Sequence, residues 1–149
     1  MRTPHAPDKA EAMALYLDHP THTLDLAVLR PVLVQLVTDA GYTLQHLSVV
    51  FTDHDTVLDL NRTYLEHDYH TDVLSFALSD TPLVVDGEVY VDLDTAAERH
   101  AEFNTAFSEE AYRYALHGTL HLVGHDDATP SGRATMRSHE NHYLALLTG

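Results

Sequence analysis

The sequence predicts a single α+β domain spanning residues 1–149, in which helices pack on one small mixed β-sheet. Segments rich in β-branched residues alternate along the chain with segments whose apolar residues recur at helical spacing. The glycine-rich phosphate loop that a nucleotide-binding fold would require is not found between these segments. A chain of 149 residues is the size of one domain, and folding can bury about two-thirds of its unfolded surface.

The first third of the chain predicts a strand, a helix and a second strand. Apolar and polar residues mix over residues 12–18, which we interpret as an edge strand. Apolar residues recur at helical spacing over residues 25–40, and Pro31 favours a helix that begins near Leu29. Residues 44–52 form a short run rich in β-branched residues, which predicts a central strand.

The middle of the chain continues this alternation. Asp53 or Asp55 can cap a helix that extends to Tyr64. A polar loop over residues 66–71 then leads into a strand over residues 73–78.

A connection, a strand and a helix follow. Residues 79–87 contain proline and glycine and predict a connection. Residues 88–93 alternate as in a further strand, and Asp94 begins a helix that runs to about Phe103.

The last part of the chain predicts two helices joined by a loop. Ser108, followed by two glutamates, opens a helix over residues 108–123. Residues 128–132 form a loop, and residues 133–147 form a final amphipathic helix.

The segment from His117 to Asp127 gathers the side chains most typical of a reactive site. His117 and His121 are four residues apart, so both rings leave the same face of the predicted helix. Gly124 can take a left-handed conformation that ends this helix and lets the chain fold back. The spacing H-x3-H-x5-D supplies three ligands and leaves one position for water, as in catalytic zinc sites.

His125 and Asp126 are rival third ligands in this motif. We prefer Asp127 because the turn needs several residues before a side chain can point back at the two rings. A solvated histidine face is the alternative interpretation, since 13 histidines in 149 residues make such a pair common by chance. The glycine and the reachable carboxylate favour a metal-binding helix, with one zinc ion per chain held by His117, His121 and Asp127.

These residues resemble the bacterial YbeY family. Residues 117–127 resemble the family pattern H-G-x-L-H-L-x-G-[YH]-D-H. Residues 61–76 resemble N-x2-Y-R-x-K-D-x-P-T-D-V-L-S-F, and residues 87–92 resemble G-D-I-x-I-S. The order and spacing of the blocks also fit, and the resemblance covers about residues 25–147.

The resemblance implies a YbeY-like fold and a single-strand-specific endoribonuclease that acts in ribosomal RNA maturation and ribosome quality control. It implies zinc-dependent hydrolysis of RNA phosphodiesters, with ribosomal RNA and ribosomal particles as partners and no role for DNA or a membrane. The alternatives are a metal-dependent hydrolase of another substrate and a non-catalytic ribosome-assembly factor.

Two positions depart from the family pattern. Asp127 stands where the family has a final histidine, and it is still a plausible zinc ligand. Leu65 stands where many members carry an arginine that is thought to act in the active site. Arg62 lies nearly one helical turn before Leu65, and Arg113 lies one turn before His117, so either could bind a phosphate in its place. Each can equally be a surface residue.

The charge of the chain argues against a nucleic-acid substrate. There are 23 acidic residues against eight basic ones, which gives a formal net charge of -15. Two explanations are compatible with RNA binding: a local gathering of arginines around the motif, and adaptation of the surface to high salt, which screens repulsion. The arginines in segments that flank the motif or lead into it are Arg62, Arg99, Arg113, Arg133 and Arg137.

Several other classes of protein are disfavoured. The chain has no cysteine, so it has neither disulfides nor thiolate ligands. No stretch approaches the apolar length of a membrane span, and residues 1–10 lack the apolar core of a leader, so we expect a cytoplasmic protein. Gly118 occupies the position of the general base in H-E-x-x-H metalloproteases, which disfavours peptidase chemistry.

Overall fold

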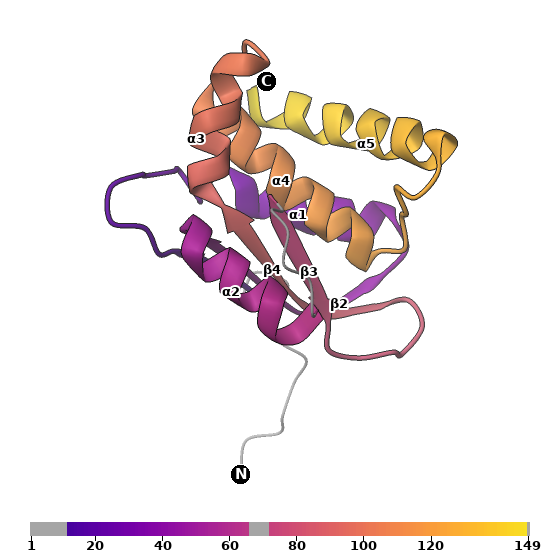
Figure 1. The fold of residues 1–149 in the computed structure, drawn as a ribbon. Coiled ribbons are helices and arrows are strands. Elements are labelled where there is room, and N and C mark those ends of the chain that lie inside the picture. Colours follow the sequence, from indigo (N-terminus) through magenta and orange to yellow (C-terminus); the bar gives the residue numbers. More distant parts are fainter. Residues whose placement is uncertain (1–11, 66–71, 149) are drawn as a thin grey trace.

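The structure is a computed structural model that describes residues 12–65 and 72–148 (Figure 1). The predicted loop over residues 66–71 lies outside the described residues. In chain order the elements are β1 (Met13–Leu17), α1 (Leu29–Asp39), β2 (Thr43–Thr52), α2 (His54–Leu65), β3 (Val73–Ala77), β4 (Val84–Asp92), α3 (Leu93–Glu102), α4 (Phe107–Leu122) and α5 (Pro130–Thr148).

The four strands form one mixed sheet in the order β1-β2-β4-β3. β1 and β4 both pair with β2 in parallel, whereas β3 pairs with β4 antiparallel. Parallel strands need a crossover between them, which α1 supplies between β1 and β2. The predicted α+β class with a small mixed sheet is therefore confirmed, and the strand over residues 12–18 does lie at a sheet edge.

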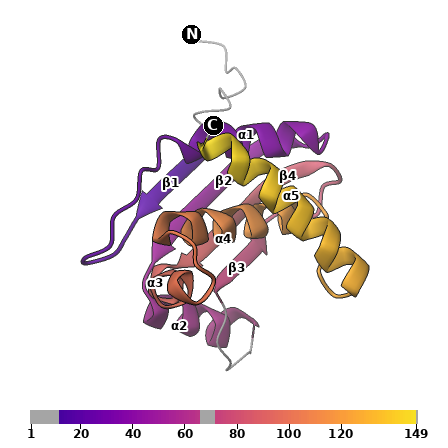
Figure 2. The same ribbon diagram turned by 90° about the horizontal axis from the view of Figure 1, so that it is seen from above.

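The helices cover the two faces of the sheet unequally. α4 lies between the sheet and α5, with α1 beside it, while α2 crosses the opposite face (Figures 1 and 2). The core lies on the α4 side of the sheet, where α1 and α4 meet the strands. Its largest fully buried side chains include Phe51, Leu29, Leu33, Leu36, Leu47, Leu93, Leu116 and Leu120.

Gly118 sets how closely α4 approaches the sheet. A Cβ atom at this position would lie 2.6 Å from Val89 Cγ1 and 3.0 Å from Ser75 Oγ. The Ser75 hydroxyl donates a hydrogen bond to the Gly118 carbonyl at 2.8 Å. Because only glycine fits this contact, it fixes the depth of α4 beside the sheet, and with it the two histidines that flank Gly118.

Two predicted boundaries in the first half of the chain are confirmed. α1 begins at Leu29, as Pro31 indicated, and Gly41 follows it with a φ of 78°. Asp53 rather than Asp55 caps α2, because its carboxylate accepts a hydrogen bond from the Thr56 backbone N–H at 2.8 Å.

Two predicted boundaries are wrong. β4 begins at Val84, so the second half of the predicted connection up to Gly87 is strand. The β-branched Val84 pairs with Thr43 of β2, and this pairing extends the sheet. α4 begins at Phe107 after Ala106, so Ser108 lies inside the first turn and does not open the helix.

The start of α5 also differs from the prediction. The helix begins at Pro130, three residues before the predicted start at Arg133. Thr129 caps it, since its hydroxyl accepts a hydrogen bond from the Gly132 backbone N–H at 2.9 Å. Proline is well suited to the first helical position because its missing N–H has no intrahelical partner there. Across the described ranges, no helix is long and apolar enough to cross a membrane.

Candidate metal centre

His117 and His121 lie on the last two turns of α4, and the chain reverses directly after them. α4 ends at Leu122, and Gly124 takes a left-handed φ of 93°. The His125 backbone N–H then donates to the Leu120 carbonyl at 3.0 Å. The predicted glycine stop is confirmed, and it turns the following segment back toward the two rings.

The structure brings the three predicted ligands together. His117 Nε2 lies 3.1 Å from His121 Nε2 and 3.2 Å from an Asp127 carboxylate oxygen. The other Asp127 oxygen lies 3.7 Å from His121 Nε2. Ligand atoms about 2.0 to 2.2 Å from one tetrahedral ion are separated by about 3.4 Å, so these spacings fit a single metal ion.

The hydrogen bonds made by the Nδ1 atoms of His117 and His121 determine that the Nε2 atoms, which face each other, carry the lone pairs. His121 Nδ1 donates to the His125 carbonyl at 3.0 Å, and His117 Nδ1 donates to a Glu140 carboxylate oxygen at 2.8 Å. Each neutral ring therefore carries its proton on Nδ1 and turns an unprotonated Nε2 toward the other. Two lone pairs and a carboxylate that face one another need a positive charge between them, which either a proton on one ring or a metal ion can supply, and oriented histidines of this kind are typical of metal sites.

Electrostatics at His117 point the same way. Burial alone lowers the pKa of His117, but the hydrogen bond to Glu140 and the negative charges of Glu140 and Asp127 raise it overall. The surroundings of this ring thus favour positive charge at the point where a metal ion would lie.

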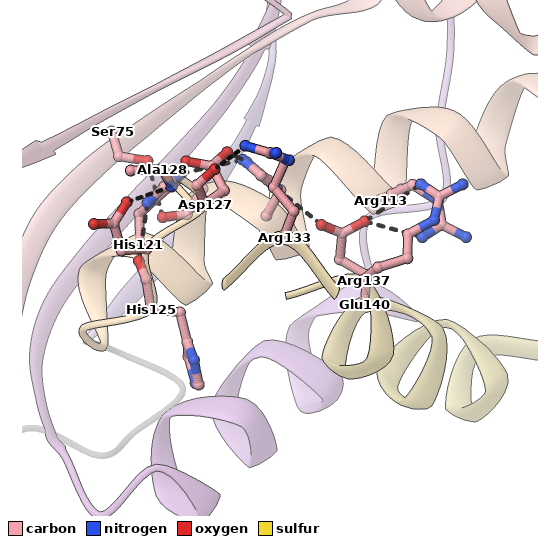
Figure 3. Close-up of polar contacts among 12 residues, drawn as sticks. Ser75, Arg113, His121, His125, Asp127, Ala128, Arg133, Arg137 and Glu140 are labelled. Carbon is pink, nitrogen blue, oxygen red and sulfur yellow. Dashed lines mark hydrogen bonds and ion pairs between the residues drawn. The ribbon is translucent and has the colours of Figure 1, made fainter. Parts of the chain in front are cut away.

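Glu140 is a site residue that the sequence motif did not reveal. It lies on α5 and is 4% exposed. It also accepts a hydrogen bond from Arg113 Nη1 at 2.9 Å, and Figure 3 shows its carboxylate facing both Arg113 and Arg137. Burial raises the pKa of Glu140, but the hydrogen bonds from His117 and Arg113 lower it overall, so the carboxylate stays ionised.

The two rival ligands have other contacts. The His125 ring packs against the His139 ring with centroids 4.5 Å apart, and it points away from Asp127 in Figure 3. The Asp126 carboxylate accepts a hydrogen bond from the Ala128 backbone N–H at 2.9 Å. Asp127 therefore remains our predicted third ligand.

A cavity of about 490 Å³ opens beside His117 and Asp127. Four of the eight basic residues of the chain line it, so the predicted gathering of arginines holds for this part of the surface. They are Arg99, Arg113, Arg133 and Arg137. Acidic residues line the cavity as well, namely Asp72, Glu110, Asp127 and Glu140, so the arginines balance the negative charge there. Their guanidinium groups are suited to bind a phosphate group next to the candidate metal centre.

The two arginines proposed as substitutes for the family arginine differ in position. Arg113 lines the cavity, but its guanidinium also donates to Glu140 and, at 2.9 Å, to Asn141 Oδ1. It is therefore placed to orient Glu140. Arg62 is exposed on α2 and is not among the described residues that line this cavity. Leu65 ends α2, and its side chain lies outside the described residues.

A second group of possible ligands consists of His19, His22 and Asp94. Here the hydrogen bonds run the other way. His19 Nδ1 accepts the backbone N–H groups of Thr21 and His22 at 3.1 and 3.0 Å. Its proton is therefore on Nε2, which donates to Asp94 at 2.8 Å. A metal ion at this nitrogen would break these contacts, so we interpret the group as a hydrogen-bonded support of the loop.

Comparisons with known proteins agree with the motif. Residues 21–148 match the protein family described as Endoribonuclease YbeY. A protein of that name from Salinibacter ruber is 53% identical over 146 residues, which is 93% of each chain. Another, from Chlorobaculum tepidum, is 33% identical over 125 residues, or 84% of this chain and 90% of the relative.

A solved structure shows the same fold. The solution structure of TM1509 from Thermotoga maritima superposes with a TM-score of 0.62 at 26% identity. The match covers 91% of this chain and 88% of that protein. The family match covers most of the sequence, including all three motif blocks. The chain therefore belongs to the YbeY family.

Proposed function

We propose that this protein is a single-strand-specific endoribonuclease that hydrolyses RNA phosphodiesters with one bound zinc ion. The observation that carries the proposal is the pair of inward-facing Nε2 atoms, 3.1 Å apart, with Asp127 beside them and an arginine-lined cavity adjoining. Both relatives are described as endoribonucleases, which supports the same reaction class.

The donor set fits zinc. Two imidazoles and one carboxylate are ligands that zinc binds in catalytic sites, where a fourth position stays open. When bound there, zinc would supply Lewis acidity to a phosphodiester and to the attacking water. The chain's own residues contribute orientation: Glu140 and the His125 carbonyl hold the two rings in the ligand tautomer.

The arginines of the cavity would position the substrate. Arg133 donates to the Asp127 carbonyl at 3.3 Å, which keeps its positive charge beside the predicted ligands. The Arg137 side chain lies 3.8 Å from Glu140, at the cavity. Because this side chain is 62% exposed, its guanidinium can reach a phosphate at the cavity mouth. These local charges offset the net charge of -15 at the one place where a phosphate must approach.

The resemblance to the family further leads us to propose ribosomal RNA maturation and ribosome quality control as the setting. The partners would then be ribosomal RNA and ribosomal particles in the cytoplasm. The alternatives are a hydrolase of another substrate and a non-catalytic assembly factor. They are favoured by the acidic surface and by Leu65, which stands at the position of the family arginine.

A cleavage assay separates these functions. Single-stranded and double-stranded RNA of the same sequence are incubated with the metal-loaded protein at low and high salt, with and without chelator. We expect cleavage of the single strand that chelator abolishes. RNA binding without cleavage would instead support the assembly factor, and neither binding nor cleavage would support another substrate.

A further inference from the structure

Tyr114 is one of the residues that line the cavity, and its hydroxyl group is buried. The residue is 6% exposed, and in the part of the chain that the structure describes its hydroxyl makes no well-formed hydrogen bond, although the Glu110 carboxylate is close enough to interact with it. Tyr112, two positions earlier on α4, differs: its hydroxyl donates to the Asp25 carbonyl at 2.8 Å. Because a buried hydroxyl without a well-formed hydrogen bond is unfavourable, a small turn of the Tyr114 side chain toward a molecule in the cavity would improve its hydrogen bonding.

Charged groups surround this hydroxyl. Burial raises the pKa of Tyr114 most, and the negative charges of Asp72 and Glu110 raise it further, against the opposing effect of Arg99. A weak hydrogen-bonding contact with Glu110 adds to the rise. The phenol therefore stays protonated and can only donate its hydrogen or accept weakly. Glu110 is itself 4% exposed and accepts a hydrogen bond from the Thr105 hydroxyl at 3.1 Å.

Phe103 adds an aromatic surface to the same part of the cavity. Phe103 follows directly after α3 and lines the cavity, and the residue is 56% exposed. An exposed aromatic ring at the edge of a polar cavity is the arrangement on which single-stranded nucleic acids stack their bases.

We propose that Phe103, Tyr114 and Arg99 form a subsite for one nucleobase of single-stranded RNA. The inference rests on the proposed function and names how its substrate is held. A phosphate is disfavoured in this part of the cavity because Asp72 and Glu110 line it as well. A base suits it better, since a base presents N–H donors to carboxylates and acceptor atoms to Tyr114 and Arg99.

The subsite lies in the same cavity as the predicted metal ligands. His117 is three positions after Tyr114 on α4, and the charge of Asp72 acts on both side chains. A nucleotide with its base on Phe103 would therefore lead its phosphate toward His117, Arg133 and Arg137, where the positive charge is gathered.

Two substitutions test the subsite. Full-length, metal-loaded protein is titrated into a short fluorescent single-stranded RNA, with Kd taken from anisotropy before cleavage proceeds and the cleavage rate recorded in parallel. Phe103→Ala should weaken binding about tenfold through the loss of stacking. Tyr114→Phe should weaken it about threefold to tenfold, while the melting temperature stays equal or rises because a buried hydroxyl without a well-formed hydrogen bond is removed.

Matched controls exclude general effects of losing an aromatic ring or a hydroxyl. Tyr16, 53% exposed on the edge strand β1, is the control for Phe103, and Tyr16→Ala should bind RNA as the wild type does. Tyr112→Phe should lower the melting temperature, because it removes a made hydrogen bond, without changing Kd. A set of RNAs, each with one abasic nucleotide at a different position, should identify one position at which removing the base weakens binding to the wild type. At that position the abasic RNA and the intact RNA should bind Phe103→Ala with equal affinity.

The outcomes separate this inference from the proposed function. Wild-type affinity in both Phe103→Ala and Tyr114→Phe, with wild-type cleavage intact, would overturn the subsite alone. Binding that depends on Phe103 but is never followed by cleavage would support the subsite and overturn the nuclease. Absence of RNA binding by the wild type would overturn both.

Discussion

Glu140 accepts a hydrogen bond from Nδ1 of His117 at 2.8 Å, although the two residues lie on different helices and 23 positions apart. The same carboxylate accepts a hydrogen bond from Arg113 at 2.9 Å. α5 is thus part of the candidate metal centre, because its packing on α4 determines which nitrogen of His117 carries the proton.

Replacing Glu140 with glutamine should weaken metal binding. The glutamine amide has one acceptor atom, whereas His117 and Arg113 both donate to Glu140, so one of the two contacts must be lost. We expect metal affinity to fall about 10- to 100-fold, measured by competition with a chromogenic chelator. Glu98→Gln, an exposed change on α3, should leave the affinity unchanged. Equal affinities of all three proteins would show that Glu140 does not orient His117.

Gly118→Ala should destabilise the fold. The added methyl group would lie 2.6 Å from Val89 Cγ1, so α4 must move away from the sheet. We expect a loss of about 1–3 kcal/mol in the free energy of unfolding, measured by urea denaturation. Ser108→Ala is the control on the same helix, and it should change stability by less than about 0.5 kcal/mol because Ser108 does not cap α4. A variant as stable as the wild type would mean that the α4 contact is looser than described.

The stability of the protein should carry a pH dependence that comes from His54. Its Nδ1 donates to the buried Asp92 carboxylate at 2.7 Å, and this hydrogen bond is the main cause that raises the pKa of His54 above 6.5. A pKa raised by folding gives stability that is fully present below about pH 6.5 and is lost as pH rises through the folded pKa.

The comparison of His54→Ala with the wild type isolates this contribution. The gap between their melting temperatures should be wider at about pH 6 than at a pH above the folded pKa of His54, where its ring is neutral in both the folded and the unfolded state. His46→Ala, an exposed change on β2, should show no such difference. A gap that is constant with pH would contradict the role given to Asp92.

Salt should stabilise this protein more than a protein of balanced charge. The formal net charge of -15 creates repulsion that ions screen within about 3 Å at 1 M salt. We expect the melting temperature and the solubility to rise between about 0.1 M and about 2 M sodium chloride. A flat melting temperature would leave the acidic surface without this explanation.

Much of this architecture follows from local sequence patterns. Helical spacing located α1 and α4, and the four-residue spacing of His117 and His121 placed both rings on one face. Gly124 indicated the turn that returns Asp127, because a left-handed residue both ends a helix and reverses the chain.

The parts that the sequence did not reveal depend on contacts between distant segments. Glu140 looks like any helix-surface glutamate until α5 packs on α4. Val84 joins β4 only because Thr43 lies beside it. The buried hydroxyl of Tyr114 likewise has no local signal, since burial of one tyrosine without a well-formed hydrogen bond depends on the elements that surround it. Thr129 followed by Pro130 did carry a local signal, the cap and first-position proline that begin α5.

The central claim is that His117, His121 and Asp127 bind one metal ion, and metal content measures it most directly. The wild type, His121→Ala and the control His142→Ala, which changes an exposed histidine on α5, are loaded with zinc, dialysed together and analysed by mass spectrometry. The account predicts about one zinc ion per chain in the wild type and in His142→Ala, and close to none in His121→Ala. A zinc content in His121→Ala equal to that of the wild type would contradict it.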